Sequence, residues 1–202
     1  MNKKYVVAVI IIVGIVGYAL YTQLIKPTLD DRMVSAVVPM TIQNEDLAFA
    51  FTYPSGEAGY TLIEPPVPTT TASGLQKVYL LMDTQEYIAF QQSESAETPP
   101  TVSVFVVKMP DVEVEGDRET RLIAWAEQYP QFSSYAVKND DTEHYDLDGV
   151  DAIRYSTDGL YRQQVYLASY RGNAYVFVGQ YNDDADGIRD MYLHLVNSVT
   201  FE

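Results

Sequence analysis

The last part of the chain alternates apolar and polar residues with the period of a β-strand. Residues 163–170 and 174–180 are both rich in Val, Tyr, Leu and Phe. Only Arg171-Gly172-Asn173 separates them, a spacing typical of a tight hairpin. A similar run, residues 150–156, precedes them across a short polar turn. The pattern predicts a three-stranded antiparallel meander.

After the meander the apolar spacing changes to that of a helix. Apolar residues recur at i, i+3, i+4 and i+7, at Ile188, Met191, Tyr192 and Leu195. The polar residues 182–186 before them supply a helix N-cap and negative charge where the helix dipole favours it. We therefore expect an amphipathic helix packed on the sheet, followed by a closing strand that ends at Phe201.

The first half of the pattern also indicates strands. Residues 47–53 alternate with period two, and residues 60–64 follow a turn, so we expect them to return as the partner strand. Residues 78–82 and 87–90 predict a second hairpin around a polar turn. The β-branched run 101–109 is typical of a central strand buried on both faces.

One more helix is predicted between the two groups of strands. Residues 117–129 carry apolar side chains at helical spacing, among them the single tryptophan, Trp125, which we interpret as a core anchor. The order of strands, helix, meander, helix and strand predicts an α+β fold, an antiparallel β-sheet flanked by helices.

The N-terminus predicts a membrane anchor. Lys3 and Lys4 precede residues 5–21, which contain no charged side chain and reach the lower limit of length for a membrane-spanning helix. A cleaved signal peptide is the alternative, although Gly17-Tyr18-Ala19 is a poor cleavage site because Tyr and Leu crowd it.

These patterns divide the chain into three parts. Residues 1–21 are the predicted transmembrane signal anchor, and residues 22–46, with Pro27 and Pro39, read as a stalk or linker. Residues 47–202 are the predicted α+β domain. We expect a single-pass protein of the cell membrane whose C-terminal domain is extracytoplasmic, or a secreted domain if the signal is cleaved.

Charge and composition narrow the classes of partner. The 28 acidic and 13 basic residues give a net charge of −15, which repels nucleic acid and anionic lipid surfaces. The chain has no cysteine, so thiol nucleophiles, thiolate metal sites, disulfides and a lipidated cysteine are excluded. We expect no nucleic-acid partner.

Short motifs lie at both ends of the predicted domain. They are Phe49-x-Phe51-x-Tyr53-Pro54-Ser55-Gly56 at the start and Leu147-Asp148-Gly149-Val150-Asp151-Ala152, Gly172, Tyr175 and Asn197-Ser198-Val199-Thr200-Phe201 at the end. Over residues 47–201 this combination resembles PsbP-like domains, the family of the extrinsic photosystem protein and its bacterial relatives. Tyr60 is the nearest aromatic residue where a tryptophan is often expected in that family. The resemblance implies a PsbP-like sandwich in an exported, non-enzymatic domain.

Two acidic stretches are candidate calcium sites. Asn182, Asp184 and Asp186 match the first half of a calcium loop, but its twelfth position is Leu193 instead of glutamate. Helix capping explains the same residues.

The second stretch surrounds a glycine and includes Asp146, Asp148 and Asp151. Their carboxylates suit a hard cation, and a solvated turn is the alternative interpretation. Calcium is the only cofactor that the sequence suggests.

Tyrosines are candidate ligand-binding residues because the chain contains 17 of them. Tyr166 and Tyr170 share one face of a predicted strand, and an exposed tyrosine face suits glycan or peptide binding. The alternative is that a helix covers this face. The two histidines, His144 and His194, lie far apart in sequence and outside any catalytic motif.

These observations order three function classes. The first is a membrane-anchored, non-catalytic binding or accessory module that contacts a protein or glycan at the cell surface through residues 64–74 and 91–101. The second is a calcium-binding extracytoplasmic domain, and the third is a secreted hydrolase that uses carboxylates. Because no nucleophile motif is present, we expect a protein that is not an enzyme.

Overall fold

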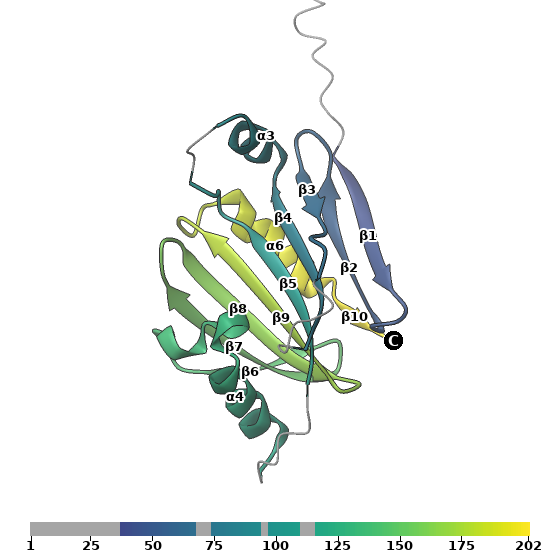
Figure 1. Ribbon diagram of the computed structural model, residues 1–202, viewed down its shortest axis with the longest axis vertical. Helices are drawn as coiled ribbons and strands as arrows, with labels where there is room; N and C mark the ends of the chain where they lie inside the picture. Colours follow the sequence, from purple (N-terminus) through teal and green to yellow (C-terminus); the bar gives the residue numbers. More distant parts are fainter. Residues whose placement is uncertain (1–36, 68–73, 94–96, 110–115) are drawn as a thin grey trace, which may run out of the picture. The chain divides into compact units, whose positions relative to one another are not determined.

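A computed structural model describes residues 37–67, 74–93, 97–109 and 116–202 of the chain (Figure 1). Its elements, in chain order, are β1 (Val38–Asn44), β2 (Phe49–Ser55), β3 (Tyr60–Ile63), β4 (Leu75–Asp83), α3 (Thr84–Gln92), β5 (Val102–Lys108), α4 (Arg118–Gln128), α5 (Pro130–Ser133), the 3₁₀ helix η2 (Tyr135–Val137), β6 (Glu143–Leu147), β7 (Val150–Asp158), β8 (Arg162–Tyr170), β9 (Asn173–Tyr181), α6 (Gly187–Asn197) and β10 (Thr200–Phe201).

The strands form one mixed sheet in the order β1-β2-β3-β4-β5-β9-β8-β7-β6, with β10 paired to β2. The described pairs are antiparallel except for β2 and β3, which meet in parallel at Ser55 and Tyr60. The central position of β5 and the β7-β8-β9 meander confirm the predictions for these segments.

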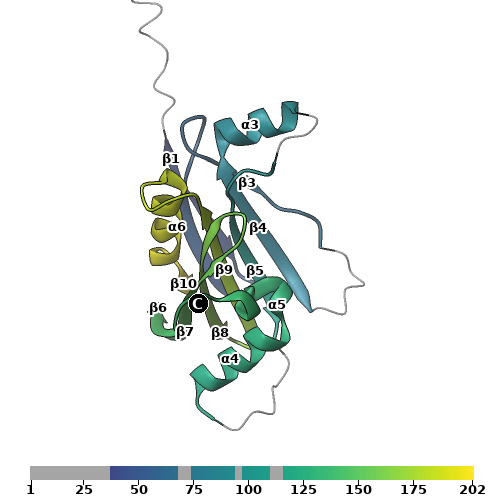
Figure 2. The same ribbon diagram turned by 90° about the vertical axis from the view of Figure 1, so that its left-hand side faces the viewer.

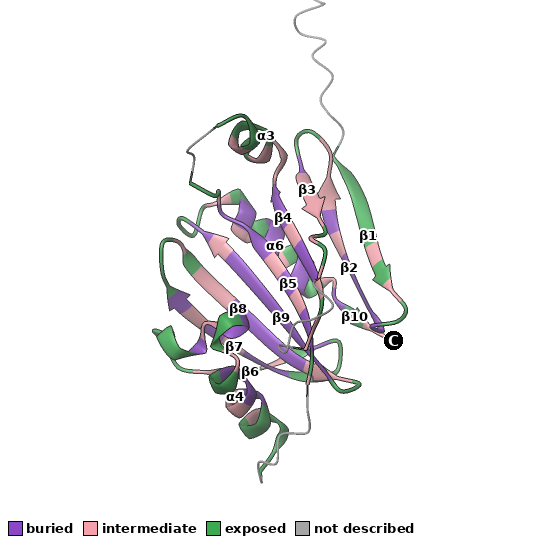
Figure 3. Ribbon diagram, viewed as in Figure 1, coloured by how far each residue is buried: buried purple, intermediate pink, exposed green. Residues whose placement is uncertain are grey.

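Two hydrophobic cores lie on opposite faces of the sheet. Along β8, Tyr166 belongs to the core that contains α6, whereas its neighbour Leu167 belongs to the core that contains α4 and α5. Successive strand residues point to opposite faces, so helices cover both faces of the sheet. Figure 2 shows α6 on one side and α4 with α5 on the other, and Figure 3 shows the buried strands between them.

Both long helices begin at the aspartates that the sequence predicts as caps. Asp117 accepts a hydrogen bond from the Thr120 backbone N–H at the start of α4, and Asp186 accepts one from Ile188 at the start of α6. Trp125 of α4 is fully buried, which confirms its role as a core anchor. The structure therefore confirms both helices and the reason why each begins where it does.

The domain begins earlier than predicted. Strand β1 lies inside residues 22–46, the predicted stalk, and pairs with β2 along its whole length, from Val38 opposite Ser55 to Asn44 opposite Phe49. Its Ile42 packs against the first core. The sequence hides this strand because Pro39 interrupts the apolar pattern, yet Pro39 is compatible with an edge strand.

Two predicted strand partnerships are wrong. Residues 87–90 belong to helix α3, because the Asp83 side chain accepts hydrogen bonds from the backbone N–H groups of Gln85 and Glu86 and caps a helix there. Strand β3 was expected to return along β2, but it pairs antiparallel with β4 over its full length.

The predicted membrane anchor, residues 1–21, lies outside the described residues. Within residues 37–67, 74–93, 97–109 and 116–202, no helix is long and apolar enough to cross a membrane.

Candidate functional site

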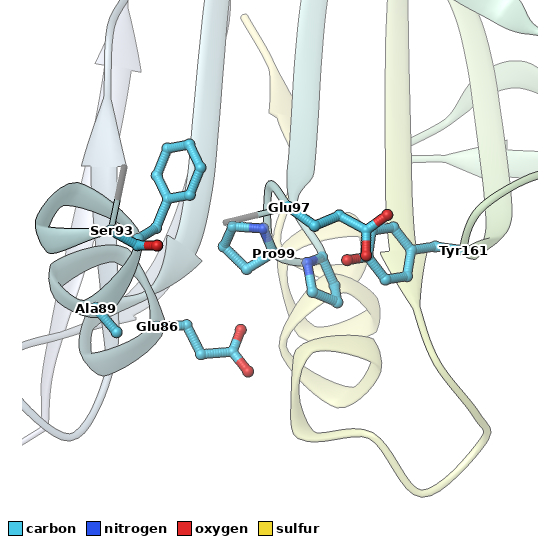
Figure 4. A pocket seen from close by; sticks show the side chains of 8 residues that line it. Glu86, Ala89, Ser93, Glu97, Pro99 and Tyr161 are labelled. Carbon is cyan, nitrogen blue, oxygen red and sulfur yellow. The ribbon is translucent and has the colours of Figure 1, made fainter. Parts of the chain in front are cut away.

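An open hollow of about 500 Å³ lies where α3, the segment before β5 and the turn between β7 and β8 meet (Figure 4). Ligand sites in proteins have volumes of about 300–1,000 Å³. The residues that line it are Glu86, Ala89, Phe90, Ser93, Glu97, Pro99, Pro100 and Tyr161. Three segments far apart in sequence thus contribute to one concave surface.

Local structure explains how the walls are held. In α3, Glu86, Ala89 and Phe90 are spaced i, i+3 and i+4, so one face of the helix forms one wall. The opposite walls are joined because the Tyr161 hydroxyl donates a 2.9 Å hydrogen bond to the carbonyl oxygen of Thr98. The same segment is fixed to the sheet by the Gln180 N–H, which donates to the Thr101 carbonyl at 3.1 Å.

The hollow has negative potential. Glu86 and Glu97 are its charged residues, and no lysine, arginine or histidine is among the described residues that line it. Partial desolvation raises the pKa of the Glu86 carboxyl, and the carboxylates of Asp83 and Asp186 raise it further. Desolvation also raises the pKa of the Tyr161 hydroxyl, with added effects of Glu97 and then Glu86.

The negative potential extends to the start of α6. Burial raises the pKa of the Tyr60 hydroxyl to about 12, and the carboxylates of Asp83, Asp186, Asp190 and Glu86 contribute to this rise. Carboxylates from β4, α3 and α6 therefore act on one region at this end of the domain.

Comparison with solved structures identifies the architecture. The solution structure of cyanobacterial PsbP (CyanoP) from Synechocystis matches with a TM-score of 0.53 and 13% sequence identity, over 84% of this chain and 96% of that one. The fold is PsbP-like. A crystal structure from Bacteroides thetaiotaomicron is less similar, with a TM-score of 0.41, 9% identity and coverage of 80% of this chain and 48% of that one. Comparisons with protein-family models and with curated protein sequences give no match.

Within the PsbP-like fold, the first candidate calcium stretch serves the start of α6. Asp186 caps the helix and also accepts a 3.0 Å hydrogen bond from the Asn182 backbone N–H. Asp184 turns toward Arg189, with 3.5 Å between Oδ1 and Nε. The capping interpretation thus accounts for Asn182, Asp184 and Asp186.

The second stretch divides its carboxylates among separate contacts. Asp146 accepts from the Gly149 N–H at 2.9 Å, and Asp148 accepts from the Phe201 N–H at 2.8 Å. Asp151 lies opposite Asp146 and 3.4 Å from the Arg118 guanidinium. Among the residues that the structure describes, no group of three or more His, Cys, Asp or Glu is arranged to hold a metal ion.

We expect millimolar calcium to leave the melting temperature unchanged. A ligand present at 100 times its Kd adds about 2.7 kcal/mol to the stability of the native state, which would raise the melting temperature by several degrees. Thermal unfolding with calcium and with chelator measures the difference. An increase that Asp146→Asn or Asp186→Asn removes would instead establish a calcium site.

The tyrosine face predicted to bind a ligand is covered. Tyr166 is only 2% exposed, and its ring packs edge-on against Tyr145 and against Tyr192 of α6. Tyr170 is half-buried, and its hydroxyl donates to the Glu202 carbonyl at 2.9 Å. The alternative interpretation, a helix over this face, is therefore correct for Tyr166.

The two histidines are on separate elements, and both are exposed. His144 lies 3.4 Å from Asp151, and His194 lies 3.4 Å from the hydroxyl of Thr52. Neither is among the residues that line the hollow. Ser93, the hydroxyl-bearing residue of that lining apart from Tyr161, has no histidine or lysine beside it there.

Proposed function

We propose that this protein is a non-catalytic binding or accessory module, held at the extracytoplasmic face of a membrane by residues 1–21, and that the hollow contacts its partner. The hollow carries this proposal because it joins apolar walls to a few polar groups, the usual composition of a binding site. The resemblance to PsbP-like domains supports a non-enzymatic role.

The entry point of the chain supports the same role. Val38 lies opposite Ser55, which pairs with Tyr60, and Thr84 at the start of α3 donates a hydrogen bond to the Gly56 carbonyl. The described domain thus begins at the end that carries α3 and the hollow (Figure 1). A tether before Val37 would keep this end near its anchor, where a high effective concentration makes weak contacts sufficient.

A carboxylate-based hydrolase is the second candidate, because Glu86 has a raised pKa and shares the hollow with Glu97. The Glu86 side chain is exposed and the hollow is open. Carboxylate pairs that cleave glycosidic bonds act on a substrate held in a site that excludes water. The binding role therefore fits this geometry better.

We expect Ala89→Trp to abolish partner capture, because the indole would fill the hollow from the exposed face of α3. Photo-crosslinking in membranes of the source cells measures capture. Ala136→Trp, on the exposed 3₁₀ helix η2, is the control and should retain it. Equal capture by both variants would refute the binding role, and hydrolysis of chromogenic glycosides or esters that Glu86→Gln abolishes would favour the hydrolase.

The anchor has its own test. Membrane fractionation should recover the protein in the membrane fraction with residues 1–21 attached. A soluble species that begins near Leu20 would show instead that the segment is a cleaved signal.

A further inference from the structure

We propose that the hollow binds a lysine or arginine side chain of a partner protein, with the cationic group between Glu86 and Glu97 and the alkyl chain against the apolar walls. This inference rests on the binding role proposed above and adds the chemistry of the partner. The argument has three parts, which concern charge, wall composition and the rim.

Charge is the first part. Glu86 lies on α3 and Glu97 lies on the segment across the hollow, and Figure 4 shows both side chains bordering it. Within the described part of the chain, neither carboxylate forms an ion pair. Asp83 and Asp186 add further negative charge beside Glu86. A bound cation would relieve this repulsion, and charge-assisted hydrogen bonds to carboxylates are among the stronger ones.

The walls favour an organic cation over a metal ion. Calcium takes 6–8 oxygen ligands at about 2.3–2.6 Å, whereas half of the lining consists of apolar residues, namely Ala89, Phe90, Pro99 and Pro100. Lysine and arginine bury their alkyl chains on apolar surface while the charged head stays in a polar environment. The ring of Tyr161 offers a face for a cation–π contact.

The rim favours a polypeptide over a small free cation. Ile88 and Leu160 are the sequence neighbours of the lining residues Ala89 and Tyr161, and they are large apolar residues exposed by 43% and 71%. They therefore add apolar surface beside two different walls of the hollow. Such a surface suits apolar residues that flank the basic side chain in a partner chain.

The test uses the full-length protein in micelles of a nonionic detergent. The probe is the capped peptide Leu-Lys-Gly-Lys-Leu, and its twin carries an acetyl group on each lysine. We expect the probe, but not the twin, to shift the backbone NMR signals of Ala89, Ser93 and Tyr161. The double variant Glu86→Gln/Glu97→Gln should weaken binding about tenfold, which corresponds to about 1.4 kcal/mol.

The matched control is Glu119→Gln/Glu127→Gln, which removes the same charge from α4 and should change the affinity less than twofold. Equal weakening by both double variants would mean nonspecific attraction to an acidic protein and would overturn the inference. Binding of spermidine as tight as that of the peptide would assign the hollow to a free polyamine. Shifts of the same signals with calcium alone would assign it to a metal ion, and either result overturns the proposal.

Failure of the inference is distinct from failure of the binding role. If Ala89→Trp abolishes partner capture while Glu86→Gln/Glu97→Gln retains it, the hollow binds a partner of other chemistry and only the inference fails. If neither variant alters capture, both fail.

Acid should weaken binding of the peptide. The groups that face Glu86 are the carboxylates of Asp83 and Asp186 and the hydroxyls of Tyr60 and Tyr161. Lysine stays protonated throughout the acid range, so the charge lost as pH falls is that of the carboxylates. Since the pKa of Glu86 is raised, the affinity should fall at a higher pH than that of an ordinary glutamate. A flat profile would contradict a carboxylate contact.

Discussion

Gly179→Ala is expected to destabilise the domain by about 2–3 kcal/mol, near the upper end of the cost of overpacking a core. A methyl group at Gly179 of β9 would lie 2.7 Å from Cε1 of the Tyr192 ring and closer still to Cγ and Cδ1. Tyr192 is fully buried on α6. Its hydroxyl oxygen lies 2.9 Å from the carbonyl oxygens of Gln164 and Phe177, so the ring cannot move away without losing these hydrogen bonds.

Gly159→Ala is the matched control. The nearest atoms to a methyl group there are 3.8 and 3.9 Å away, which is ordinary van der Waals contact, so the change should cost less than about 0.5 kcal/mol. Urea unfolding of the two variants measures the difference. Similar stability for both would show that α6 can shift over β9 without cost, and the close approach of Tyr192 to Gly179 would then not hold the helix in place.

The contact between α6 and β9 also bears on the candidate site. Asp186, the cap of α6, is one of the carboxylates that raise the pKa of Glu86 beside the hollow. A displaced α6 would change the charge around that site. We therefore expect Gly179→Ala to lower the affinity for the lysine peptide as well as the stability.

The elements that the sequence predicts well are those whose pattern is local. In α6, a polar cap at Asp186 and apolar residues from Ile188 to Leu195 recur on one face, and in β7 to β9 the turns are short. Capping, amphipathicity and tight hairpins are decided by residues close in sequence. For this reason the order of elements led to the correct fold class.

Helix α3 shows where local pattern fails. Tyr87, Ile88 and Phe90 favour a strand by composition, but no residue of this helix is fully buried, so packing provides little periodicity. The Asp83 cap decides the helix. Its two hydrogen bonds to Gln85 and Glu86 can be identified only once the preceding strand is known to end there.

The candidate site was predicted only in part. The interval 91–101, expected to contact a partner, contains Glu97, Pro99 and Pro100, which form one wall of the hollow. Glu86 and Tyr161 come from other segments, and no spacing in sequence relates them. Their meeting depends on the pairing of β5 with β9 and of β8 with β7, which is a property of the whole sheet.

A chain shortened to begin at Leu47, the predicted start of the domain, is expected to be less stable than one beginning at Val37 by about 3 kcal/mol or more. The shorter chain lacks β1, which has seven residues paired with β2, and each backbone hydrogen bond contributes about 1 kcal/mol. It also loses Ile42 from the first core and the 3.1 Å hydrogen bond from the Asn44 side chain to the Tyr79 hydroxyl. The edge of β2 would then be open and prone to aggregation. Thermal unfolding should show a melting temperature lower by about 6–12 °C. Equal melting temperatures would mean that β1 is dispensable and that the stalk extends to Asp46.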